Sequence, residues 1–125
     1  MTENEIATRI LDVSFALHKH LGPGLLESVY EKTLAYELIQ AGLSVQNQVL
    51  VPLVYKELKF DIGFRIDLLV ENKVIVELKS IETLAPVHFS QTLTYLRLTD
   101  KGLGLLMNFN CKYLKDGVHR VANNL

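Results

Sequence analysis

The sequence is poor in cysteine, with Cys111 as its single thiol. One thiol cannot form a disulfide within the chain, and it cannot build a cysteine-based zinc cage. The spacing of the four histidines does not match a zinc site either. The sequence therefore excludes a disulfide-stabilised scaffold and a structural zinc module.

Long hydrophobic runs are also absent. No apolar stretch approaches the roughly 18 residues that a membrane-spanning helix needs, and no charged start followed by an apolar segment marks secretion. We therefore expect a soluble, cytoplasmic protein with no membrane partner.

Neither sign of charge dominates, because 13 basic and 14 acidic residues give a net charge of −1. A protein that coats nucleic acid is usually basic, so the charge balance leaves only local, metal-assisted contact with nucleic acid, or none. The sequence also lacks the glycine-rich phosphate loop that ends in Lys-Ser/Thr and the Gly-x-Ser-x-Gly elbow. These absences exclude the commonest nucleotide-hydrolysing and serine-hydrolase sites.

The chain is nevertheless rich enough in apolar residues to fold. A content of 49% in 125 residues argues against disorder and predicts one domain, residues 1–125, with a single core. Thr2 to Glu5 forms a capping box, and apolar residues at helical spacing follow as far as Leu21. The remaining pattern predicts a helix over about 26–41, strands over 43–55, 58–70 and 73–80, a helix over 86–99, and strands over 103–109 and 118–121.

The clearest strand pattern is the alternation between Leu58 and Val70. It predicts that one face carries seven apolar side chains and that the other face is mainly polar. The expected apolar face consists of Leu58, Phe60, Ile62, Phe64, Ile66, Leu68 and Val70.

Asp67 and Glu77 lie near the ends of two apolar runs, where charged residues are unexpected without a reason. Opposed residues of an antiparallel hairpin share a face. Asp67 faces Glu77 only if the loop between the strands holds three residues, Glu71 to Lys73. A two-residue loop would turn Glu77 to the other face. The sequence permits the longer loop because Asn72, at its centre, tolerates positive φ.

The opposed carboxylates would suit a hard divalent cation, because their Cβ atoms would lie roughly 4.5–5.5 Å apart. Lys79 follows Glu77 by two residues and points to the same face. Two carboxylates and a lysine at a strand end are what metal-dependent phosphodiester cleavage requires.

Two helices offer further candidates, each with a plainer alternative. Gln91 and Tyr95 share one face of the helix over 86–99, while Phe89, Leu93 and Leu96 point toward a core. Spacing alone favours an ordinary amphipathic helix. Glu27 lies in the first turn of the helix over 26–41, where the helix dipole stabilises a carboxylate whatever its function.

Together these residues resemble the PD-(D/E)xK nuclease superfamily, whose motif here is Asp67 followed by Glu77-Leu78-Lys79. Residues Gln91 to Tyr95 are similar to the Gln-x-x-x-Tyr motif of its RecB-type exonuclease branch. Residues Gly24 to Tyr30 resemble the signature of the GxxExxY proteins. The residue before Asp67 is Ile66 rather than proline, a common departure.

The resemblance implies an α/β fold of the α+β type, a restriction-endonuclease-like αα-βββ-α-β core with a mixed central sheet flanked by helices. It implies Mg²⁺ or Mn²⁺ bound by Asp67, Glu77 and the Leu78 carbonyl. Lys79 would prepare the attacking water or neutralise phosphate charge, and Glu27 would assist through the metal's water shell. Gln91 would orient the site, and Tyr95 would position nucleic acid.

The expected function is metal-dependent hydrolysis of phosphodiester bonds, with DNA as the expected substrate. The alternative is a catalytically inactive nuclease-fold module that binds nucleic acid or a protein partner, because a fold does not establish a function. A homodimer that builds a groove between subunits, or an accessory protein, would suit either possibility.

Overall fold

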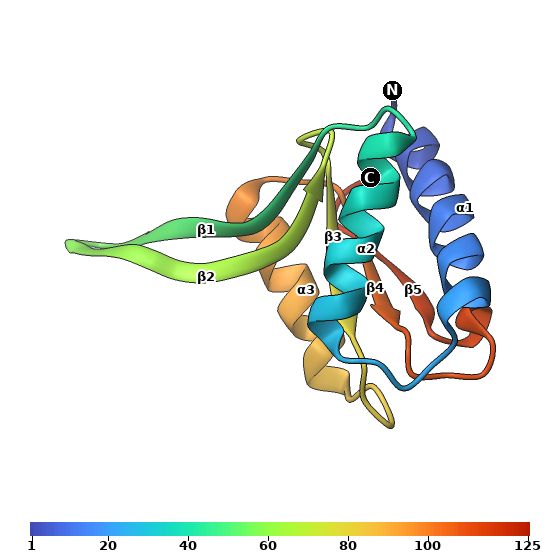
Figure 1. Cartoon of the computed structure of the whole chain (residues 1–125). Helices are drawn as coiled ribbons and strands as arrows, with labels where there is room; N and C mark the ends of the chain where they lie inside the picture. Colours follow the sequence, from blue (N-terminus) through green and yellow to red (C-terminus); the bar gives the residue numbers. More distant parts are fainter.

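The computed structural model describes all residues from 1 to 125, and its elements follow the predicted order (Figure 1). Each predicted boundary agrees with the structure to within about two residues. The helices are α1 (Glu3–Leu21), α2 (Glu27–Gln40) and α3 (Pro86–Thr99), and one 3-10 turn spans Leu114–Asp116. The strands are β1 (Val45–Tyr55), β2 (Leu58–Val70), β3 (Val74–Lys79), β4 (Leu103–Asn108) and β5 (Val118–Ala122).

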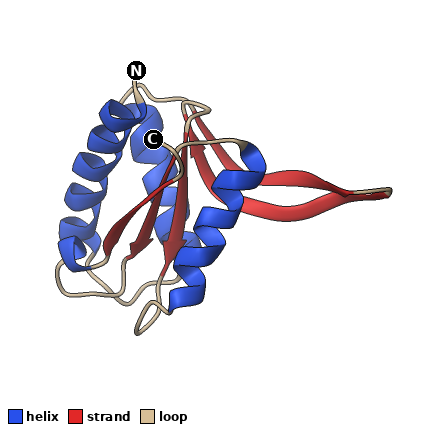
Figure 2. Cartoon of the chain, turned by 180° about the vertical axis from the view of Figure 1, so that it is seen from behind, coloured by secondary structure: helices blue, strands red, loops and turns tan.

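The five strands form one mixed sheet in the order β1-β2-β3-β4-β5. Only β3 and β4 are parallel, and α3 is the crossover between them. Helices α1 and α2 cover one face of the sheet and α3 covers the other (Figures 1 and 2). The expected mixed sheet flanked by helices is therefore confirmed. No helix has the length and apolar character needed to cross a bilayer.

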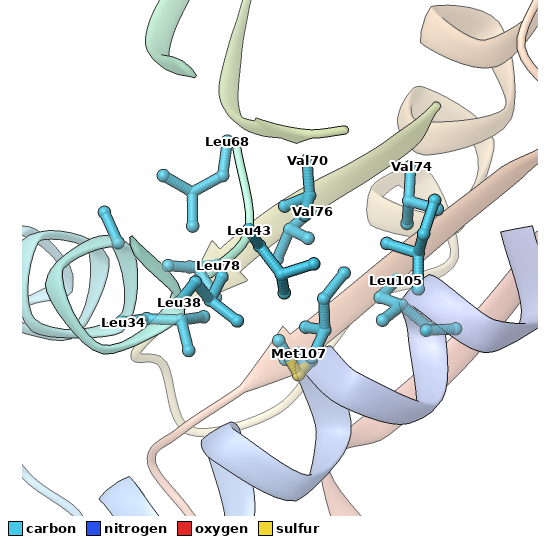
Figure 3. Packing of buried hydrophobic residues seen from close by; sticks show 14 of the residues in the cluster. Leu34, Leu38, Leu43, Leu68, Val70, Val74, Val76, Leu78, Leu105 and Met107 are labelled. Atoms are coloured by element: carbon cyan, nitrogen blue, oxygen red, sulfur yellow. The ribbon is translucent and has the colours of Figure 1, made fainter. Parts of the chain in front are cut away.

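The larger core cluster lies between the sheet and helices α1 and α2. In Figure 3, Leu34 and Leu38 of α2 face side chains from three neighbouring strands, including Leu68, Val76 and Met107. These strand residues recur every second position, which is why one face of the sheet is continuously apolar. A smaller cluster on the other face joins Leu96 of α3 to the sheet residues Ile66, Leu69 and Ile75.

The N-terminal capping box is confirmed, with Thr2 and Glu5 exchanging side chain–backbone hydrogen bonds. The connector after α1 turns at Gly22, whose φ of 75° favours glycine. Tyr30 locks this connector, because its buried hydroxyl donates to the Gly22 carbonyl (2.6 Å) and accepts from the N–H of Leu25 (3.1 Å). The start of α2, and with it Glu27, is thereby fixed against the sheet.

The register of the β2–β3 hairpin agrees with the three-residue loop that the sequence analysis required. Val70 pairs with Val74 and Leu68 pairs with Val76, so Glu71, Asn72 and Lys73 form the connection. Glu71 and Asn72 both adopt positive φ, at 53° and 54°. Asp67 and Glu77 are the next opposed positions along this register.

The first half of the predicted apolar face of β2 does not pack on the body of the protein. Strands β1 and β2 project from the body as a two-stranded ribbon, here called the arm (residues 49–65), which no helix covers along most of its length (Figures 1 and 2). Strand alternation cannot distinguish a face that packs on a core from one that projects into solvent. Three residues of the predicted apolar face are therefore exposed: Leu58, Phe60 and Ile62.

The prediction that Ile66 and Leu68 share one face of β2 was wrong. Ile66 packs in the α3-side cluster, whereas Leu68 packs in the cluster under α1 and α2, although strict alternation places them on one face. On β1 the pairs Asn47–Leu68 and Val49–Ile66 flank Gln48, which has a φ of 50°. We infer that the unusual backbone at Gln48 interrupts the ladder opposite Asp67, so that β2 turns toward the arm at this point.

Helix α3 lies close to the sheet because β4 carries glycine at the contact. A Cβ atom at Gly104 would lie 2.9 Å from the Cγ2 methyl of buried Thr92. This distance is shorter than real Cβ atoms show, so a side chain at position 104 would push α3 outward.

Gly104→Ala should therefore destabilise the protein by about 1–3 kcal/mol, the usual cost of overpacking a core. Adding Thr92→Ser, which removes the methyl and keeps the hydroxyl bonded to the His88 carbonyl, should restore part of the loss. Urea denaturation of the two single variants and the double variant measures this coupling. Additive effects of the two substitutions would show that the contact does not set the position of α3.

Candidate nucleic-acid cleavage site

Strands β2 and β3 separate at Asp67 and Glu77. The backbone ladder ends at the Leu68–Val76 pair. Beyond it, the Asp67 N–H donates to Glu77 Oε2 (2.9 Å), and the Leu78 N–H donates to Asp67 Oδ2 (2.9 Å). We call Asp67 and Glu77 the crossed pair, since the carboxylate of each accepts a backbone N–H of the opposite strand. No hydrogen bond engages the second oxygen of either carboxylate.

Burial dominates the electrostatics of the crossed pair. Glu77 is only 4% exposed, and burial, followed by the nearby Asp67 carboxylate, raises its pKa to about 8. Burial also raises the pKa of Asp67, while the hydrogen bond from the Leu78 N–H and the charge of Lys79 act in the opposite direction. Two adjacent carboxyl groups in a poorly solvated position cannot both ionise easily. The site therefore holds a proton near neutral pH unless another cation replaces it.

Lys79 lies half-buried at the end of β3, two residues after Glu77. Its positive charge lowers the pKa of both carboxyl groups in the crossed pair, so the ammonium group interacts electrostatically with both of them. No protein hydrogen bond occupies the ammonium group. Lys79 is available to a ligand while its backbone carbonyl, which accepts the Phe109 N–H (2.8 Å), holds the strand in place.

A small recess of about 190 Å³ adjoins Asp67. The structure brings Glu27, a candidate from the sequence, to the wall of this recess. Glu27 Oε2 accepts from the Ser80 N–H at 3.4 Å, which connects the first turn of α2 to the end of β3. The recess is lined by Glu27, Ser28, Glu31, Gln48, Arg65, Asp67 and Leu78.

Glu31 and Arg65 are site residues that sequence reasoning missed. Glu31 lies one helical turn after Glu27, so the spacing of four residues was the available signal. Burial and the Asp67 carboxylate raise the pKa of Glu31, and Gln48 donates a hydrogen bond to it. Arg65, two residues before Asp67 on β2, lines the same recess and lowers the pKa of Asp67. The recess therefore contains mixed charge.

Helix α3 contributes Tyr95 to this region. The Tyr95 ring stacks on Phe64 with a centroid distance of 4.4 Å. Burial raises the pKa of the Tyr95 hydroxyl, and Glu77 and Asp67 raise it further, which places the hydroxyl within the field of the crossed pair. Gln91 lies one turn earlier, exposed and without a protein hydrogen bond.

The buried face of α3 is rotated slightly from the one predicted, which consisted of Phe89, Leu93 and Leu96. Thr92 and Leu96 are fully buried, whereas Phe89 and Leu93 are half-buried. Burial of Thr92 is tolerated because its hydroxyl donates to the His88 carbonyl one turn back.

The donor set of the site fits a hard divalent cation that keeps much of its water. The crossed pair offers one free oxygen from each carboxylate, and oxygen is the ligand type that Mg²⁺ and Mn²⁺ prefer. No group of three or more histidine, cysteine or acidic side chains is arranged to hold a metal ion by itself. Any cation at this site would therefore be weakly held by protein and would depend on water or substrate for its remaining ligands.

The burial of Glu77 gives a prediction for metal-free protein. The pKa of Glu77 is raised from its ordinary value of 4.5 to about 8. Between these values the unfolded chain releases a proton that the folded chain retains, so this residue's contribution to stability falls as pH rises. Glu77→Gln keeps an oxygen that can accept the Asp67 N–H and removes the charge.

Relative to wild type, Glu77→Gln should therefore gain stability between pH 5 and pH 9, on the order of 2–4 kcal/mol. Urea denaturation in the presence of a chelator measures the difference. A stability difference that stays constant over this range would show that Glu77 ionises normally.

Comparison with known protein families matches residues 4–121 to the PD-(D/E)XK nuclease superfamily. Searches of curated proteins and of solved structures found no match. The match spans nearly the whole chain, and the αα-βββ-α-β order with its mixed sheet is consistent with a restriction-endonuclease-like fold. The chain therefore belongs to the PD-(D/E)XK nuclease superfamily.

Proposed function

We propose that this protein is a divalent-metal-dependent nuclease that hydrolyses phosphodiester bonds in DNA. One observation carries the proposal: the crossed pair is held at the point where β2 and β3 separate, with the Lys79 charge beside it. Family membership supports phosphodiester hydrolysis as the class of reaction. The whole chain, residues 1–125, would act as one catalytic domain.

Asp67, Glu77 and the Leu78 carbonyl would hold Mg²⁺ or Mn²⁺. The Leu78 N–H points toward Asp67, and in an antiparallel strand the N–H and C=O of one residue point to the same neighbour. The Leu78 carbonyl is therefore directed toward the gap where β2 leaves β3. A cation bound there would polarise the phosphate and favour ionisation of water.

The chain's own groups would do the remaining work. Lys79 would hold the attacking water by hydrogen bonding, or neutralise charge that develops on the phosphate oxygens. Glu27 and Glu31 would hold water molecules at the wall of the recess. Arg65 would attract the phosphate to a site whose carboxylates would otherwise repel it.

Tyr95 and Gln91 would position the nucleic acid. The Tyr95 ring is fixed by its stacking on Phe64, which leaves the hydroxyl near the crossed pair. Gln91 is exposed on the preceding turn of α3 and is free to bond a backbone phosphate or a base. This pair would act as the Gln-x-x-x-Tyr motif of the exonuclease branch.

We also infer that the chain belongs with the GxxExxY proteins inside the superfamily. Each residue of that signature has a distinct position here. Gly24 adopts a φ of 95°, Glu27 accepts the Ser80 N–H, and the Tyr30 hydroxyl locks the connector before α2. The signature would thus place one carboxylate beside the end of β3.

A non-catalytic module is the second candidate, and one observation favours it. The crossed pair satisfies two backbone N–H groups, so both carboxylates already have a structural role. A scaffold, however, would keep these bonds with neutral side chains and avoid the cost of a buried charge. The presence of a buried, ionisable Glu77 is therefore better explained by a site that binds a cation during the reaction.

Lys79→Ala should remove most cleavage, on the order of a 10²–10⁴-fold loss in rate if the lysine assists proton transfer. Its melting temperature and metal affinity should stay close to those of wild type, because the ammonium has no protein hydrogen bond to lose. Labelled single- and double-stranded DNA and RNA with Mg²⁺ or Mn²⁺ provide the assay, and Lys115→Ala, at an exposed position, is the matched control.

If the wild type cleaves no substrate with either metal, the non-catalytic module becomes the better account. If Lys79→Ala unfolds the protein, the lysine is structural.

Asp67→Asn should weaken Mn²⁺ binding by tenfold or more while the protein remains folded. The amide keeps an oxygen for the Leu78 N–H but loses the charge that attracts the cation. Calorimetric titration compares this variant with Asp12→Asn, which changes an exposed aspartate on α1. Equal Mn²⁺ affinity in wild type and Asp67→Asn would place the metal elsewhere.

A further inference from the structure

The arm leaves large apolar side chains in solvent. On β2, Leu58, Phe60 and Ile62 are 60%, 47% and 57% exposed, and on β1 Val54 and Tyr55 are similarly open. A two-stranded ribbon is marginally stable in water unless further strands or a helix complete it. The base of the arm is supported by the stacking of Phe64 on Tyr95, but its outer part packs on nothing within the chain.

The outer part of the arm also has an unpaired strand edge. Strand β2 pairs with β1 along one edge, and β3 occupies the other edge only from Leu68 to Val70. The segment from Leu58 to Arg65 therefore presents open backbone donors and acceptors. No residue of this segment is proline or has positive φ, so its backbone stays extended. Such an edge is a template for pairing with another strand.

The sequence along this edge is complementary to itself. If two copies of β2 pair antiparallel with Phe60 opposite Phe60, then Lys59 of each copy faces Asp61 of the other. In the same register Leu58 faces Ile62. Opposed residues of antiparallel strands share a face, so the Leu58–Ile62 contact joins two apolar side chains and the Lys59–Asp61 contact joins two opposite charges. Any register shifted by one pair loses the two charge complements.

We propose that the chain forms a homodimer in which the β2 edges of two arms pair antiparallel about Phe60. The product is a continuous four-stranded sheet in the order β1-β2-β2-β1, closed by a two-fold axis. The dimer satisfies the open edge of each arm and brings Leu58, Phe60 and Ile62 of both copies together. It does not depend on the proposed nuclease activity.

The charge of the arm favours a second copy over nucleic acid as its partner. Along the arm, three basic residues alternate with two acidic ones, so the arm is almost neutral. A ribbon that enters a DNA groove would carry a clear excess of lysine and arginine. The five residues are Lys56, Glu57, Lys59, Asp61 and Arg65.

The test is a charge exchange at exposed positions, followed by sedimentation equilibrium over a range of protein concentrations. Wild type should form dimers. Lys59→Asp places two acidic residues opposite each other at both contacts, and Asp61→Lys places two basic ones there. Each single variant should raise the dimer dissociation constant by about tenfold or more. Circular dichroism and melting temperature should show that both variants remain folded, because neither side chain is buried.

The two weakened variants should associate with each other when mixed, since every contact in the mixed dimer again joins opposite charges. The double variant Lys59→Asp/Asp61→Lys should likewise dimerise nearly as well as wild type. Recovery in both cases identifies this register specifically.

Wild type that stays monomeric at all concentrations would overturn the proposal. Single variants that remain weak after mixing would show that the arms do not pair in this register. A monomer whose duplex DNA binding is lost on Lys59→Asp would identify the arm as a nucleic-acid contact instead.

Discussion

The site depends on how two neighbouring strands separate. At Asp67, β2 leaves β3 and turns toward the arm, so the backbone ladder stops. The Leu78 N–H then has no partner on β2, and the ladder to β1 is interrupted at Gln48, opposite Asp67. Buried donors without partners cost roughly 1–3 kcal/mol each. The carboxylates of Glu77 and Asp67 accept the N–H groups of Asp67 and Leu78 instead. The two acidic side chains thus supply the hydrogen-bond acceptors that the backbone lacks where the strands separate.

This arrangement gives the carboxylates a structural role and leaves them able to bind a ligand. Each uses one oxygen to bond a backbone N–H and keeps the other oxygen free. Burial of Glu77 raises its pKa to about 8, so the metal-free site favours a proton. The charge that makes the site costly to fold is the charge that would draw in a cation. The charges of Lys79 and Arg65 lower the pKa of Asp67 and so favour its ionised form.

Much of the fold and the central pair could be predicted from the sequence because periodicity and parity are local properties. The capping box of Thr2 and the bounds of the helices follow from short patterns. The sequence permitted the three-residue loop before β3 without requiring it, and the opposition of Asp67 and Glu77 was predicted on the condition that this loop forms. Family resemblance, and not spacing, pointed to Glu27 and Tyr95.

The remaining features depend on contacts between distant segments, which no local pattern encodes. The alternation of β2 is the same whether its apolar face meets a helix or solvent, so the arm was not predicted. Glu31 became part of the site only because α2 packs beside Asp67. The place of Tyr30 is likewise decided by its bonds to the Gly22–Leu25 connector.

The most direct test of this account is a carboxyl-carbon NMR titration of Asp67 and Glu77 with and without Mg²⁺. The account predicts that Glu77 in metal-free protein titrates well above its ordinary value of 4.5, near 8. Saturating Mg²⁺ should displace that proton and move the titration of Glu77 to clearly lower pH, because metal and proton compete for one carboxylate. A Glu77 that titrates near 4.5 and does not respond to Mg²⁺ would contradict the account.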